Sequence, residues 1–173
     1  DNFEQSISYF NEIKMLSYPR FEEFHEKTYY NLGYNYFKLR DFVNSEKEFK
    51  LFISKSKDEK RKVDATLRLA DAMFMQKKYS LASSYYSNFS LTSDFDVDYA
   101  LYQNSICFSL LSDFKKQRES LQQIIQSFPN SRYYFQCLYD DAKLNYRSRN
   151  SDKAKETLQK IIESQANNEI VAK

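Results

Sequence analysis

The stretch "YYNLGYNYFKLRDF", residues 29–42, contains Gly33, the one glycine of the 173-residue chain. Its apolar residues recur at helical spacing, which predicts an amphipathic helix ending at a polar turn at Arg40 and Asp41. A glycine inside a helix costs about 1 kcal/mol relative to alanine. The position of Gly33 therefore requires a reason outside its own helix, such as close contact with a second helix.

The pattern around Gly33 returns three more times along the chain. When Gly33 is placed over Ala70, Ser105 and Ala142, the offsets are 37, 35 and 37 residues, and all four residues are small. Under the same offsets, a second apolar column reads Phe49, Tyr86, Leu121 and Leu158. Because several columns agree under one set of shifts, the sequence predicts four units of nearly equal length.

Each unit is predicted to form two antiparallel helices. In the first unit, residues 25–40 form one helix and residues 41–55 form the other, with apolar residues of the second helix on one face. Such a pair leaves a further face open, which a neighbouring hairpin must cover. The expected fold is therefore all-α, a solenoid of stacked helix hairpins. Where the helices cross, a side chain larger than a methyl or hydroxymethyl group would push them apart.

These columns resemble the tetratricopeptide repeat (TPR), a helix–turn–helix unit of about 34 residues that builds right-handed superhelical solenoids. The first unit matches the signature of the family at Tyr29, Leu32, Gly33, Tyr36, Asp41, Phe42 and Phe49. Two departures are Gln117, which interrupts a column of small residues, and Ser151, which replaces the aromatic residue of the turn. The resemblance covers nearly the whole chain.

The repeat register divides residues 1–173, expected to be a single TPR solenoid segment, into shorter parts. Residues 1–19 fit the second helix of a preceding repeat, and residues 169–173 look like the start of a further helix. The four repeats between them span 25–61, 62–96, 97–133 and 134–168. A solenoid cut within a unit at both ends would expose core residues, so we expect this chain to be a segment excised from a longer protein.

Composition excludes several classes of function for this segment. The chain has 26 basic and 24 acidic residues without a basic face, which disfavours nucleic-acid binding. No apolar run approaches the ~20 residues that span a bilayer, so we expect no direct membrane insertion. One glycine excludes P-loop, dinucleotide and GxSxG sites, and one histidine, His25, excludes a HExxH zinc site. We predict no enzymatic activity and no cofactor, and we expect Cys107 and Cys137 to be buried, unpaired thiols.

The predicted functional feature is therefore the surface. The TPR resemblance implies that the first helices line a concave face. It implies these candidates for binding: Tyr30, Tyr34, Phe37, Lys38, Leu67, Asp71, Phe74, Tyr99, Tyr102, Ile106, Tyr139, Lys143, Tyr146 and Arg147. The column Tyr30, Leu67, Tyr102 and Tyr139 suits peptide contacts, because tyrosine combines a rigid apolar face with a hydroxyl. Alternatively, these tyrosines mainly pack between neighbouring first helices. The Lys and Asn constellation with which some family members grip acidic chain ends is absent.

The predicted function is a non-enzymatic scaffold that binds a peptide segment or a partner helix of another protein in the concave groove. One alternative is a carbohydrate-binding helical-repeat module, which the absence of Trp disfavours. Another is an RNA reader of the pentatricopeptide type, which the near-neutral charge disfavours. A third is a structural spacer within a larger bacterial envelope protein. Residues 126–147 are similar to repeats of bacterial envelope proteins, including outer-membrane assembly lipoproteins and the coordinator of the Tol–Pal system. This similarity favours the bacterial envelope or periplasm over the cytoplasm.

Overall fold

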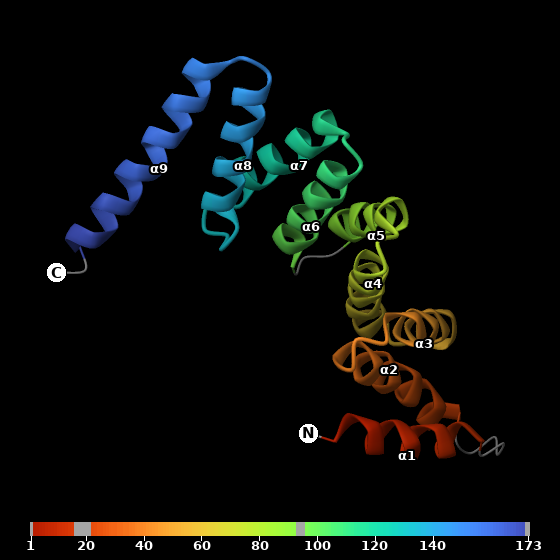
Figure 1. Cartoon of the computed structure of the whole chain (residues 1–173). Helices are drawn as coiled ribbons and strands as arrows, with labels where there is room; N and C mark the ends of the chain where they lie inside the picture. The colour runs from red at the N-terminus through yellow and green to blue at the C-terminus, as the bar shows by residue number, and fades with distance from the viewer. Residues whose placement is uncertain (1, 16–21, 93–95, 172–173) are drawn as a thin grey trace. The chain divides into compact units, whose positions relative to one another are not determined.

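The computed structural model describes residues 2–15, 22–92 and 96–171, and all regular secondary structure within these ranges is α-helical (Figure 1). The helices are α1 (Phe3–Met15), α2 (Glu22–Lys38), α3 (Phe42–Lys55), α4 (Glu59–Met75), α5 (Tyr79–Thr92), α6 (Val97–Leu110), α7 (Phe114–Ser127), α8 (Tyr134–Arg147) and α9 (Ser151–Val171). The predicted all-α class is confirmed.

The chain divides into two compact units, Asp1–Ser93 and Asp94–Lys173. In the first unit, each helix from α1 to α5 packs against the next one along the chain, and α4 also touches α2 (Figure 1). In the second unit, α6, α7, α8 and α9 pack in the same consecutive way. Each unit is therefore a series of consecutively packed helices, in which α4 packs on the hairpin of α2 and α3, and α8 packs against α7.

The turn within each hairpin has the same backbone conformation. Arg40, Lys77, Ser112 and Arg149 have φ values of 62°, 61°, 60° and 62°, at the spacing of the small-residue column. The Arg40 N–H donates to the carbonyl three residues earlier, at 3.0 Å, and the next N–H donates to the carbonyl five residues earlier, at 2.9 Å. The other three turns repeat both bonds. This pairing is the Schellman motif, which closes the C-terminus of a helix with one left-handed residue.

Replacing Arg40 with glycine should stabilise the first unit, because a left-handed conformation strains any residue that has a Cβ. The strain is about 1–2 kcal/mol, and the extra unfolded-state entropy of glycine offsets about 0.5–1 kcal/mol of the gain. We expect Arg40→Gly to raise the free energy of unfolding by about 0.5–1 kcal/mol in urea denaturation followed by circular dichroism. Arg40→Ala is the matched control, since it removes the long side chain but keeps the Cβ. Equal stability of the two variants would contradict this explanation.

All four members of the small-residue column are buried, and Gly33 lies where α2 crosses α3. A Cβ built on Gly33 would lie 2.7 Å from Cδ1 and Cε1 of Phe49 on the facing helix. The Gly33 carbonyl also accepts a hydrogen bond of 2.8 Å from the Ser45 hydroxyl. The predicted close crossing is confirmed, but our allowance for a methyl group is wrong at Gly33, because the Phe49 ring occupies that space.

Two further predictions concern the end of the chain and the two cysteines. The prediction that a further helix begins at residue 169 is wrong for residues 169–171, because they continue α9. The sequence from Ser151 to Val171 contains no Gly or Pro that would end the helix earlier. Residues 172 and 173 lie outside the described residues. Cys107 and Cys137 are buried and unpaired, as predicted. Burial raises the pKa of each thiol to about 12.

Candidate functional site

In the first unit, the candidate tyrosines of α2 bond to the neighbouring first helix. The hydroxyls of Tyr30 and Tyr34 donate to Oδ2 of Asp64 on α4, at 2.7 and 2.5 Å. The Tyr30 ring also lies 5.0 Å from the Phe52 ring, between centroids. Burial, followed by the bond to Asp64, raises the pKa of both tyrosines above the ordinary value. These neutral hydroxyls join α2 to α4, which favours the packing interpretation of the tyrosine column here.

A second set of polar contacts continues through α4 to α5. Arg68 lies between two carboxylates, with Nε 3.5 Å from Oδ1 of Asp64 and Nη1 donating to Oδ2 of Asp71 at 2.6 Å. The hydroxyl of Tyr86 on α5 donates to the other oxygen of Asp71, at 2.7 Å. Burial alone would lower the pKa of Arg68, but the negative charge of Asp71, with smaller contributions from Tyr34 and Asp64, raises it above its ordinary value.

Two candidates of the first unit are therefore not surface residues, which corrects the sequence-based prediction. Leu67 is 1% exposed and Asp71 is 6% exposed. Both belong to α4, which packs against α3 and α5 and also touches α2, so they cannot line an accessible face. The half-buried Phe37 and Phe74 each contact the aromatic residue that begins the next helix, at 5.3 and 5.5 Å between centroids. Lys38 is exposed at the end of α2.

In the second unit, the candidates of α6 also pack within the protein. The Tyr102 ring stacks on Tyr133, just before α8, with centroids 4.7 Å apart and planes at 15°. Tyr99 contacts the same ring in a tilted arrangement at 6.1 Å. Ile106 is half-buried. The candidates of α6 thus contribute to the packing of α6 against the start of α8.

The four candidates of α8, in contrast, come together in an open groove between α8 and α9. The groove has a volume of about 810 Å³, and Tyr139, Lys143, Tyr146 and Arg147 line it. Tyr139 and Tyr146 are 48% and 71% exposed. The Tyr139 ring lies 5.2 Å from the Lys143 ammonium, which also pairs with Asp140 at 3.0 Å. Together with the exposed Lys38 of α2, these residues form the accessible part of the predicted set.

Residues of α9 complete this groove, and the sequence analysis did not include them. Leu158, 38% exposed, and Lys155 line its other side, while the buried Ala142 and Ala154 line it where α8 and α9 face each other. The TPR resemblance directed attention to first helices, whereas α9 is a second helix. The repeat register contained the missing signal, because Leu158 occupies the column of Phe49, a fully buried residue in the first unit.

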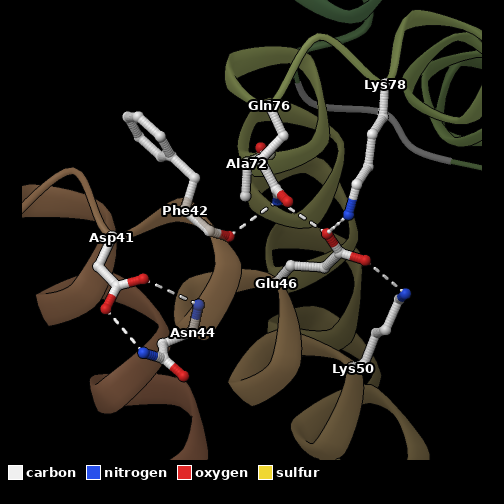
Figure 2. Close-up of polar contacts among 8 residues, drawn as sticks. All are labelled: Asp41, Phe42, Asn44, Glu46, Lys50, Ala72, Gln76 and Lys78. Atoms are coloured by element: carbon white, nitrogen blue, oxygen red, sulfur yellow. Dashed lines mark hydrogen bonds and ion pairs between the residues drawn. The ribbon is translucent and has the colours of Figure 1, made fainter.

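A polar junction closes the contact between α3 and the end of α4 (Figure 2). The Gln76 amide donates to the Phe42 carbonyl at 2.9 Å and to Glu46 Oε2 at 2.7 Å. Lys78 and Lys50 donate to the two oxygens of Glu46, at 2.8 and 2.6 Å. Although burial opposes it, these bonds lower the pKa of Glu46 to about 2. The Glu46 carboxylate is thus the acceptor on which this junction is built.

No family model and no curated protein matches the sequence, but solved structures match its fold. The crystal structure of MamA has a TM-score of 0.78 at 14% identity and covers 96% of this chain and 91% of its own. YrrB, described as a TPR protein with an unusual peptide-binding site, has a TM-score of 0.72 at 15% identity over 95% of this chain and 79% of its own. The C-terminal part of a TPR repeat-containing protein from Cytophaga hutchinsonii has a TM-score of 0.75 at 18% identity, and the match covers 94% of this chain and 59% of that one.

The chain has the TPR fold. Within the part of this TPR chain that the structure describes, no helix is long and apolar enough to cross a membrane. The same described residues contain no group of three or more His, Cys, Asp or Glu side chains placed to hold a metal ion. His25 belongs to α2, but its side chain is outside the described part.

Proposed function

We propose that this chain is a non-enzymatic protein-interaction scaffold that binds a partner helix in the groove between α8 and α9. The observation that carries this proposal is the exposed apolar lining of that groove, formed by Tyr139, Tyr146 and Leu158. Exposed aromatic and aliphatic side chains beside a groove are typical of surfaces that bind amphipathic helices.

The first unit supplies an internal precedent for a helix as the occupant. The hairpin of α2 and α3 has the same columns as that of α8 and α9, and α4 packs on it. There, Phe49 is fully buried, and Tyr30 bonds to Asp64 of the covering helix. The equivalents in the second unit, Leu158 and Tyr139, are exposed. This comparison supports an α-helix as the occupant of the groove.

The charges around the groove define the chemistry of the partner. Lys143, Arg147 and Lys155 line it, and none of the described residues that line it is acidic. Opposite charges across an interface favour association and fix its orientation. We therefore expect a partner helix with an apolar stripe flanked by Asp or Glu.

Site-specific photocross-linking tests this proposal. A benzoylphenylalanine placed at Tyr146 should cross-link one defined segment of a partner protein, whereas the same probe at the exposed Val43 of the first unit should not. The synthetic segment should bind the chain and become helical, and Tyr139→Ala combined with Leu158→Ala should weaken binding at least about tenfold.

Leu81→Ala and Tyr102→Ala are the control variants for this experiment. Leu81 is exposed in the first unit, and Tyr102 is a member of the tyrosine column that packs on Tyr133. Binding that survives the loss of Tyr139 and Leu158 in a folded protein would overturn the groove as the binding site. If only Tyr102→Ala weakens binding of the segment, the binding surface is the tyrosine column at Tyr102 and not the groove.

A further inference from the structure

The junction of Figure 2 has a counterpart 72 residues later in the chain, at the contact of α7 with the end of α8. The repeat register places Phe114 at the position of Phe42, and Arg118 at the position of Glu46. An acidic acceptor in the first unit is thus replaced by a cation in the second.

Two hydrogen-bonding side chains of the first junction have shorter replacements in the second. Ser148 replaces Gln76, and its hydroxyl donates to carbonyls of its own helix, at Leu144 and Asn145, each at 3.0 Å. Asn150 replaces Lys78. Both junctions border an open cavity, of about 520 Å³ beside Glu46 and about 650 Å³ beside Arg118. What differs is the lining, because the carboxylate of Glu46 is replaced by the guanidinium of Arg118.

Three cations line this cavity. They are Lys115, Arg118 and Arg147, and Glu119 is the one acidic residue among the described residues that line it. Among the described residues, neither Lys115 nor Arg147 forms an ion pair with a carboxylate. The Arg147 guanidinium instead lies 4.9 Å from the centroid of the Phe114 ring, which is 41% exposed.

Arg118 is only partly neutralised by the protein itself. Its Nε lies 3.6 Å from Oδ1 of the buried Asp141, and neither atom has a hydrogen-bond partner. The other oxygen of Asp141 accepts from Asn145 at 3.0 Å. The position of Asp141 belongs to Leu69 in the first unit, so the charge reversal at Arg118 comes with a new acidic residue beside it. Even so, three cations outnumber the two acidic groups.

We propose that the cavity between α7 and α8 binds a carboxylate of an acidic peptide. Arg118, Lys115 and Arg147 supply donors from two helices, and charge-assisted bonds to a carboxylate are stronger than neutral ones. The exposed Phe114 ring offers apolar contact to the peptide beside that carboxylate. The site is distinct from the α8–α9 groove and does not depend on the function proposed there, although Arg147 borders both.

Nuclear magnetic resonance with defined peptides tests this site. An acetylated and amidated tetraglutamate should produce saturable shifts in the amides of residues 114–119 and 144–148 and in the Arg118 Nε–H. Sodium chloride at equal ionic strength and the tetraglutamine analogue should not. Comparison with the non-amidated peptide distinguishes side-chain from chain-terminal carboxylates, since stronger binding of the non-amidated form assigns the terminal group.

Two variants separate the cavity from general charge effects. Lys115→Gln should weaken tetraglutamate binding about threefold to fivefold, the size of one partly exposed ion pair, whereas Lys116→Gln on the same helix should not. Arg118→Glu, Asp141→Leu, Ser148→Gln and Asn150→Lys together rebuild the first junction without changing net charge, and should abolish the saturable shifts. Unchanged binding in either the Lys115 variant or the rebuilt one would overturn the proposal, as would equal binding of tetraglutamine. Circular dichroism establishes that each variant is folded.

Discussion

Substituting Gly33 is expected to destabilise the first unit more than any other change in its small-residue column. A Cβ at this position meets the Phe49 ring at 2.7 Å, and the ring is confined by Tyr34 at 5.3 Å between centroids. Overpacking costs about 1–3 kcal/mol, and better helix propensity offsets about 1 kcal/mol of it for alanine. We expect Gly33→Ala to lower the free energy of unfolding by about 1–2 kcal/mol, and Gly33→Leu by about 3 kcal/mol or more. Urea denaturation measures the loss, and hydrogen exchange in α2 and α3 localises it.

The chain contains its own control for this effect. In the fourth repeat, Ala142 stands at the position of Gly33 and Leu158 at that of Phe49. Gly33→Ala in a Phe49→Leu background should therefore be neutral or stabilising, because the ring that meets the Cβ is gone. The second repeat combines Ala70 with Tyr86, so the effect depends on where the Phe49 ring lies rather than on its being aromatic. An equal loss of stability with and without the Phe49 ring would contradict steric contact as the reason for glycine.

The fold could be predicted from this sequence because the packing of helices imposes the same requirements on each of the four repeats. Small residues at the crossing and apolar residues opposite them recur under the same offsets of 37, 35 and 37 residues, and each offset corresponds to one helix hairpin. The left-handed residue of each turn was not predictable in the same way. Arg40, Lys77, Ser112 and Arg149 share no side-chain type, and glycine, the usual signal for this conformation, is absent from all four. Their φ values and backbone hydrogen bonds reveal that they share one conformation.

The candidate site was less predictable, since a repeat column records position along a helix and not what covers it. Leu67 and Tyr139 share one column, yet the first is in the core and the second faces an open groove. The difference arises from the neighbours of each helix. Arg68, three residues before Asp71, was the local sign that Asp71 serves an internal ion pair, because residues three apart on a helix face each other.

Asp71→Ala is therefore expected to act on stability and not on partner binding. The carboxylate accepts from Arg68 and from the Tyr86 hydroxyl in a site that is 6% exposed, and Tyr86 itself is 1% exposed. Breaking a buried pair costs about 3–5 kcal/mol when one charge is left behind. Arg68 keeps its contact with Asp64, so we expect a loss of about 3 kcal/mol in urea denaturation.

Two further substitutions separate the charge of Asp71 from its role as an acceptor. Asp71→Asn keeps a carbonyl oxygen for Tyr86 and should lose less stability than Asp71→Ala, while Tyr86→Phe should cost about 1–2 kcal/mol because it leaves one oxygen of Asp71 without that donor. Asp71→Ala and Tyr86→Phe remove the same hydrogen bond. The variant that carries both substitutions should therefore lose less stability than the sum of the two single losses. If Asp71→Ala leaves unfolding unchanged but weakens binding of the cross-linked partner segment, Asp71 belongs to an accessible face after all.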